Sequence, residues 1–218
     1  AAPESVGLSA QKLGRIGEVF RQEIDQGKLP GAVLLVARKG RLAYAQALGF
    51  QNKDAGKPMA KDTLFRIYSM SKPLVSVAAM MLVEDGRMQL TDPVSKFLPA
   101  MKSMTVSVAK ADAEFARLAY TAVPADREMT VQDLLRHTSG LIYGTRGKSL
   151  VNAAYVESKI LSRDDSNEEF VAKLSKLPLR FSPGDRWEYG VSTDVLGRVV
   201  EVVSGKTLGE FDNERILS

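Results

Sequence analysis

The chain has 218 residues, of which 44% are hydrophobic and 26% charged, the proportions of an ordinary globular protein with one large domain or two small ones. Its 30 basic and 26 acidic residues give a net charge of +4, but the signs are mixed along the chain, which argues against nucleic-acid binding, and no apolar run is long enough to cross a membrane. The lack of cysteine excludes disulfides, thiolate catalysis and cysteine-based zinc sites, and the single histidine, His137, excludes a histidine-rich metal site.

The N-terminal part of the chain predicts one helix followed by a hairpin. Residues 9–26 carry apolar side chains at three- and four-residue spacing behind Ser9, which can cap the first turn, so we expect an amphipathic helix. Residues 32–37 and 42–49 are strand-like runs on either side of a turn at 38–40. The inward face of the helix is expected to carry Leu13, Ile16, Val19, Phe20 and Ile24.

The strands of this part are too few for a stable sheet. A two-stranded hairpin is not independently stable in water, and its apolar face has only the first helix available as cover. The sequence also stops soon after an amphipathic stretch over 211–217 that has no turn signal behind it. We therefore expect the remaining strands in a complementary C-terminal fragment or in a second chain.

From residue 64 onward the chain predicts a short extended piece, a buried helix and then mainly helices and long loops. Residues 64–67 have a strand-like pattern, and residues 74–84 are apolar nearly all round, as expected of a buried helix. Capping-box patterns begin at Thr130 and at Ser166. The later helices are expected over 92–98, 130–136, 166–177 and 193–205.

Ser69 and Lys72 lie where the extended piece gives way to the apolar helix. Residues three apart share one face of a helix, so Lys72 would lie beside the Ser69 hydroxyl, and Pro73 suits the first helical turn. Burial there is expected to lower the lysine pKa, so that the amine can take the hydroxyl proton. A free backbone N–H at the helix start can stabilise an oxyanion.

A Ser-x-x-Lys pattern alone is weak evidence for a nucleophile. The chain holds two other copies, Ser9 with Lys12 in a surface-type helix and Ser107 with Lys110 in a polar stretch with no apolar helix behind it. Only Ser69 precedes a buried helix, and this context favours a nucleophile over an ordinary helix-capping serine.

Three longer stretches carry a family resemblance. Residues 65–73, which include Tyr-Ser-Met-Ser-Lys, together with the apolar helix and residues 84–94 resemble the nucleophile region of class C β-lactamases, family VIII carboxylesterases and DD-peptidases. The stretch 134–141 resembles that family's loop after a short helix, and 181–197 resembles the segment with its second catalytic motif. The stretches come in the family's order and cover nearly the whole chain.

The resemblance implies an α+β fold, in which an α/β sandwich with an antiparallel sheet carries an inserted helical domain. This β-lactamase/transpeptidase-like fold would be incomplete in this chain. Residues 1–66 would supply the N-terminal helix and strands of the α/β domain, and residues 67–218 the nucleophile helix and a mostly helical domain.

The same resemblance implies the roles of three residues. Ser69 would form the acyl-enzyme, Lys72 would share its proton, and Tyr189 would serve as base or as relay to the leaving group. Whether Lys72 or Tyr189 is the base in acylation stays open, and no metal or cofactor is required.

Two features depart from the family pattern. Lactamases and peptidases continue the tyrosine motif as Tyr-x-Asn, whereas Tyr189 is followed by Gly190 and Val191, which favours the carboxylesterase branch. The third motif, a strand near the C-terminus, is not in the chain, and Gly205-Lys206-Thr207 mimics it only superficially. His137 is expected to be structural, at the end of a short helix.

Three functions follow from these expectations. The leading hypothesis is a serine hydrolase that acts on short-chain carboxylic esters, with room for weak β-lactam turnover. The second is a β-lactamase or D-amino-acid peptidase or amidase, and the third is a non-catalytic penicillin-binding or scaffold protein. The expected partners are a small ester or lactam substrate and the complementary fragment, and the compartment stays open with the cytoplasm slightly favoured.

Overall fold

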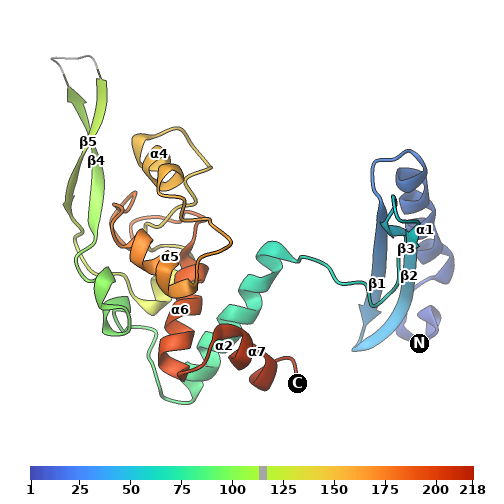
Figure 1. Ribbon diagram of the computed structural model, residues 1–218. Helices are drawn as coiled ribbons and strands as arrows, with labels where there is room; N and C mark the ends of the chain where they lie inside the picture. The colour runs from blue at the N-terminus through green and yellow to red at the C-terminus, as the bar shows by residue number, and fades with distance from the viewer. Residues whose placement is uncertain (113–116) are drawn as a thin grey trace. The chain divides into compact units, whose positions relative to one another are not determined.

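The computed structural model describes residues 1–112 and 117–218, which form two compact units, Ala1–Arg66 and Ile67–Ser218. The first unit combines helix and sheet, and the second is mostly helical with one long hairpin (Figure 1). Within the described ranges, no helix combines the length and the apolar character needed to cross a membrane.

The first unit has the predicted helix and hairpin. The Ser9 side chain accepts the Lys12 N–H and begins the helix as expected. Lys39 and Gly40 both have positive φ, 53° and 68°, and this pair of left-handed residues gives the turn the twist that a two-residue hairpin requires. The elements are η1 (Pro3–Val6), α1 (Ala10–Asp25), β1 (Gly31–Arg38), β2 (Arg41–Asn52) and β3 (Lys57–Pro58), with the antiparallel strands in the order β1-β2-β3.

Helix α1 covers one face of this sheet. A Cβ on Gly17 would lie 2.4 Å from Oε1 of Gln46 and 2.7 Å from the hydroxyl oxygen of Tyr44, so a larger residue there would displace these two side chains of β2. Val19, which was predicted to face inward, is 55% exposed. The reason is that the contact is centred on Gly17, which leaves Val19 at the edge of the helix face.

The opposite face of the same sheet is also apolar. Val33 pairs with Ala47 and Leu35 with Ala45, and directly opposite residues of an antiparallel pair lie on one face. Leu35 is 61% exposed within the chain. The sheet therefore has two apolar faces, of which α1 covers one.

The second unit is built on helix α2 and helix α6. The buried face of α2 carries Val75, Ala78, Ala79 and Leu82, and α6 contributes Val195, Leu196, Val199 and Val200. Gly197 lets Leu208 of α7 approach within contact distance. The elements are η2 (Tyr68–Ser71), α2 (Lys72–Glu84), η3 (Val94–Lys96), η4 (Pro99–Met101), β4 (Thr105–Asp112), β5 (Arg117–Pro124), α3 (Val131–Arg136), α4 (Leu150–Glu157), α5 (Asn167–Leu174), α6 (Ser192–Ser204) and α7 (Leu208–Arg215).

The second unit differs from the sequence prediction in three places. The stretch around Ser107 is not a polar loop but strand β4, which pairs with β5 in an antiparallel hairpin (Figure 1), and Val106 of β4 is part of the buried core. Helix α4 was not predicted at all. Residues 64–67 belong to no strand, and Leu64 is 97% exposed.

The predicted capping boxes are confirmed at Thr130 and Ser166. Asp133, in the first of them, also accepts two hydrogen bonds from Arg127, at 2.7 and 2.9 Å, and one from Thr138 at 2.8 Å. Burial alone would raise the pKa of Asp133, but these hydrogen bonds outweigh it and lower the pKa to about 2. The ionised carboxylate thus anchors α3 and the loop that follows it.

Candidate active site

Ser69 lies at a sharp turn directly before α2. It belongs to the short helical turn η2, which continues into α2, and Pro73 lies in the first turn of α2 as predicted. The preceding residue, Tyr68, has a φ of 46°, a left-handed conformation that is rare for a bulky side chain and is typically found where function requires it. This turn leaves Ser69 exposed at the start of the helix.

The structure brings the three predicted residues into one cluster. The hydroxyls of Tyr189 and Ser69 are hydrogen bonded at 2.7 Å, although 120 residues separate them in sequence. The ammonium nitrogen of Lys72 lies 5.0 Å from the centre of the Tyr189 ring and donates a hydrogen bond of 2.9 Å to the Tyr143 hydroxyl. The cluster therefore contains a serine hydroxyl, two phenols and one ammonium group.

The pKa of Lys72 shifts in the direction opposite to the prediction. Desolvation is the largest single influence and lowers the pKa, as expected from burial. Hydrogen bonds with Tyr143 and Tyr189, together with the negative charge of Asp194, outweigh it, so that the pKa of Lys72 is raised. The lysine is half-buried, and it holds its proton more firmly than a free lysine does.

The pKa of Tyr189 is lowered. The hydrogen bond with Ser69 is the largest cause, and the hydrogen bond and positive charge of Lys72 act in the same direction against a smaller desolvation effect. A phenol with a lowered pKa next to a serine hydroxyl can accept the serine proton.

Tyr143 is the member of the cluster that the sequence motifs do not predict. Burial raises its pKa more than the hydrogen bond from Lys72 lowers it, so this phenol keeps its proton. The available signal was its position in the loop directly after the stretch 134–141, but nothing in the sequence shows that this loop reaches Lys72.

The Tyr189 segment is held by the loop after α3. The backbone N–H of Glu188 donates to the carbonyl of His137 at 2.9 Å, and the N–H of Gly184 donates to Thr138 at 2.8 Å. The His137 ring lies 4.9 Å from the Tyr189 ring and accepts the Gly190 N–H at 3.4 Å. His137 therefore supports Tyr189 and its backbone, in agreement with the expected structural role.

The position of the family's asparagine is part of the core. Val191 is fully buried, with 0% exposure. At Gly190 an added Cβ would lie 2.2 Å from the Leu141 carbonyl oxygen, so the backbone there passes close to the 141–142 segment. No polar side chain is presented at these two positions.

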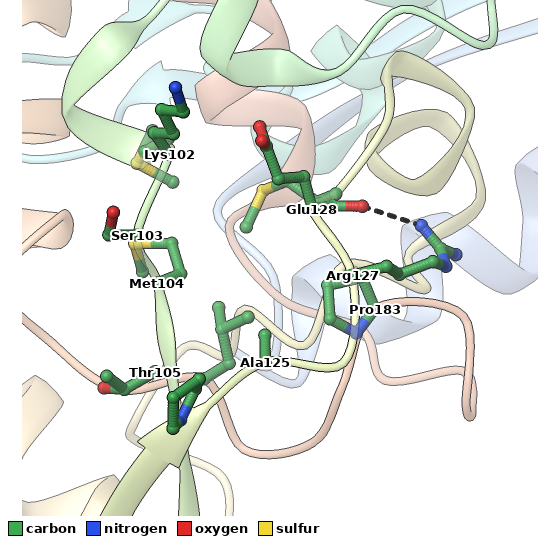
Figure 2. Close-up of a pocket in the computed structure, with 12 residues that line it drawn as sticks. Lys102, Ser103, Met104, Thr105, Ala125, Arg127, Glu128 and Pro183 are labelled. Carbon is green, nitrogen blue, oxygen red and sulfur yellow. Dashed lines mark hydrogen bonds between the residues drawn. The ribbon is translucent and has the colours of Figure 1, made fainter.

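Of two cavities in the second unit, one includes Tyr143 of this cluster and the other includes none of its residues. One of about 450 Å³ begins at Tyr143 and is lined by apolar side chains such as Tyr155 and Ile160 together with the charged residues Lys159, Arg163 and Asp164. Another of about 500 Å³ lies at the base of the β4–β5 hairpin, between Lys102–Thr105 on one side and Ala125–Glu128 with Pro183 on the other (Figure 2). Ser69, Lys72 and Tyr189 are not among the described residues that line the second cavity.

This chain is similar to known proteins over most of its own length. Esterase EstB of Burkholderia gladioli is 36% identical over 209 residues, which cover 94% of this chain and 49% of EstB. The solved structure of EstCE1, described as a hydrolase with promiscuous acyltransferase activity, matches with a TM-score of 0.75 and 30% identity over 94% of this chain and 51% of its own. The solved structure of simvastatin synthase from Aspergillus terreus matches with a TM-score of 0.78 and 27% identity. The match covers 95% of this chain and 51% of the synthase chain.

The chain thus spans about half the length of the proteins it matches. The fold is the β-lactamase/transpeptidase-like α+β fold that the sequence predicted, and this chain contains part of it. The profile of the family described as Beta-lactamase matches residues 16–218, and the chain therefore belongs to that family.

Proposed function

We propose that this chain carries the nucleophile, the base and the supporting ammonium group of a serine hydrolase that works through an acyl-enzyme. The observation that carries the proposal is the 2.7 Å hydrogen bond between Ser69 and Tyr189 beside the Lys72 ammonium group. The similarity to EstB and EstCE1 supports a hydrolase.

The electrostatics favour Tyr189 as the base in acylation. A lysine with a raised pKa remains an ammonium group, and this charge stabilises the phenolate form of Tyr189. In this mechanism the Tyr189 phenolate takes the Ser69 proton while the serine oxygen attacks the ester carbonyl carbon.

The tetrahedral intermediate then collapses with the help of a backbone N–H and Tyr189. Its oxyanion can accept a hydrogen bond from the Ser69 N–H, because the first N–H groups of a helical turn have no partner inside it. Tyr189 returns the proton to the leaving alkoxide oxygen as the carbon–oxygen bond breaks. A water molecule, deprotonated by Tyr189, attacks the acyl-enzyme, and the released Ser69 oxygen takes the proton back.

The proposed substrate is a short-chain carboxylic ester, with β-lactam turnover weak at most. Lactamases and peptidases of the family typically have an asparagine two residues after the tyrosine, and this chain has Gly190 and buried Val191 there. The alternative is a β-lactamase or D-amino-acid peptidase whose amide-binding group comes from elsewhere. A penicillin-binding protein without turnover is the alternative of another class.

A complementary segment is proposed as a partner of the first unit. The sheet face with Val33 and Leu35 is apolar and is not covered by α1. Additional strands or helices of the same protein would bury it and complete the sheet.

The test uses the complete protein that contains this chain. It should release 4-nitrophenol from the hexanoate ester, and a fluorophosphonate should add its mass to the peptide that contains Ser69. Ser69→Ala should abolish both, and Ser71→Ala, which removes a hydroxyl two residues away, should keep both.

A fluorescent penicillin distinguishes the alternatives. Stable labelling of Ser69 without hydrolysis of any ester would assign a penicillin-binding protein, and rapid β-lactam turnover would assign a lactamase. Ester hydrolysis that survives in Ser69→Ala would show that the nucleophile is a different residue.

A further inference from the structure

Arg146 lies against the proposed base. Its guanidinium carbon is 5.1 Å from the centre of the Tyr189 ring, and its side chain is exposed. Within the described parts of the chain, no carboxylate forms an ion pair with Arg146. A guanidinium group with no acidic partner is thus placed on the surface of the catalytic cluster.

The loop that carries Arg146 is held in one conformation. The side-chain amide of Asn152, which is only 2% exposed, donates to the Gly144 carbonyl at 3.0 Å and to the Arg146 carbonyl at 2.7 Å. Its oxygen accepts from the Ser149 hydroxyl at 2.6 Å. Gly144 and Gly147 have φ values of 78° and 114°, which favour glycine, so this loop is specified by its sequence.

Two positive charges therefore flank the Tyr189 ring. Lys72 lies 5.0 Å from the ring centre and donates its hydrogen bond to the Tyr143 hydroxyl. Arg146 has no such partner, and its planar group presents a pair of N–H donors that match a carboxylate. Because the ring contact and the fixed backbone already restrict this side chain, binding an anion through it costs less conformational entropy than at a free arginine.

We propose that Arg146 is a substrate-binding residue that recognises an anionic group, so that the site prefers esters bearing a carboxylate on the acyl or the alcohol side. This proposal rests on the proposed serine-hydrolase function, because it requires an ester to be bound at Ser69.

The experiment compares matched pairs of esters with the complete protein. On the acyl side, 4-nitrophenyl adipate monoester is paired with 4-nitrophenyl hexanoate, since both have six-carbon acyl chains and only the first has a carboxylate. Adipate is chosen over succinate because the succinate carboxylate would attack its own ester. On the alcohol side, 4-carboxyphenyl hexanoate is paired with phenyl hexanoate.

Arg146→Gln should lower kcat/KM for the anionic member of at least one pair about tenfold, the effect expected for one lost charge-assisted hydrogen bond, and change the neutral member less than about twofold. Arg146→Lys keeps the positive charge but loses the paired N–H donors of the guanidinium group. Its kcat/KM for the anionic ester should lie between the values of the unaltered protein and of Arg146→Gln. Arg136→Gln removes another exposed arginine of the same unit and should leave all ratios unchanged. The preference should also weaken as salt is added.

The proposal is overturned if Arg146→Gln leaves the ratio of kcat/KM for the anionic ester to kcat/KM for the neutral ester unchanged in both pairs, including the case in which both values fall equally. Failure of the underlying function looks different, because the unaltered protein would then hydrolyse neither the neutral nor the anionic esters in a Ser69-dependent way.

Discussion

The two units of this chain differ in how completely they bury their apolar side chains. In Ala1–Arg66 the buried hydrophobic residues are Val6 and Leu13, whereas the continuous buried cluster of the chain lies entirely within Ile67–Ser218. The first unit has a sheet with one apolar face that α1 does not cover. In the second unit, helices α2, α6 and α7 pack against one another.

The proposed catalytic groups follow the same division. Ser69, Lys72, Tyr143 and Tyr189 all belong to the second unit, which has its own core. The geometry of the proposed nucleophile and its proposed base is therefore set by one well-packed unit, whereas the proposed complementary segment concerns the first unit. The following predictions test this contrast.

The largest effect is expected from removing a phenol oxygen in the second unit. Tyr189→Phe deletes the proposed base and should lower kcat/KM for a neutral ester about 10³-fold, which corresponds to about 4 kcal/mol. The matched control is Tyr44→Phe in the first unit, whose buried hydroxyl has no hydrogen-bond partner among the described residues. Steady-state kinetics of both variants check the contrast, and equal activity of the two variants would remove Tyr189 from the mechanism.

The second prediction concerns the uncovered sheet face. If a complementary segment buries it, Leu35→Asp should destabilise the complete protein by about 3 kcal/mol, because a charge is then placed in an apolar interface. Val19→Asp, at a similarly exposed site on α1, should cost less than about 1 kcal/mol. Urea unfolding measures both, and a neutral Leu35→Asp would mean that this face stays in water.

The third prediction concerns the Asp133 carboxylate, which holds α3 and the loop that follows it. The pKa of Asp133 is lowered from 3.8 to about 2, so its ionised form stabilises the fold above pH 4, and this contribution is lost as the pH falls toward 2. Asp133→Asn should therefore cost about 2 kcal/mol at pH 7 and clearly less at pH 3. Glu168→Gln, which alters an exposed ion pair with Arg198, should cost little at either pH. A penalty for Asp133→Asn that does not depend on pH would contradict the assignment.

The smallest effect is expected at Tyr143. Tyr143→Phe removes one hydrogen bond that raises the pKa of Lys72, so the ammonium form should be lost at a lower pH than in the unaltered protein. We expect kcat/KM to fall about tenfold and the descending alkaline limb of the pH profile to move to lower pH. An alkaline limb that stays in place would show that Tyr143 does not act through Lys72.

Sequence patterns predicted the local features of the fold well. Ser9 capping, the turn at Lys39-Gly40 and the capping box at Thr130 each depend on neighbouring residues, and the structure has all three. The sequence analysis does not predict the β4–β5 hairpin, although Val106 and Val108 alternate with polar residues, because the polar composition of the surrounding stretch favours a loop. A period-two pattern was present there, and composition obscured it.

Three of the four residues of the candidate site could be predicted from the sequence, but Tyr143 and the electrostatics of the site could not. Ser69, Lys72 and Tyr189 follow from motifs, but the direction of the Lys72 pKa shift depends on two phenols that lie 71 and 117 positions further along the chain. Burial, which was estimated from the apolar helix, has the predicted sign and is outweighed by these distant contacts. Only the folded structure shows how many acceptors surround one ammonium group.

The hydrogen bond that joins Ser69 to Tyr189 also fixes when the chemistry can begin. Because 120 residues separate the two hydroxyls, a nascent chain carries its serine long before its phenol leaves the ribosome. During synthesis the Ser69 hydroxyl is an ordinary alcohol, because the proposed base is not yet beside it. In the proposed mechanism, reactivity begins only when the segment around Tyr189 has folded back onto the start of the second unit.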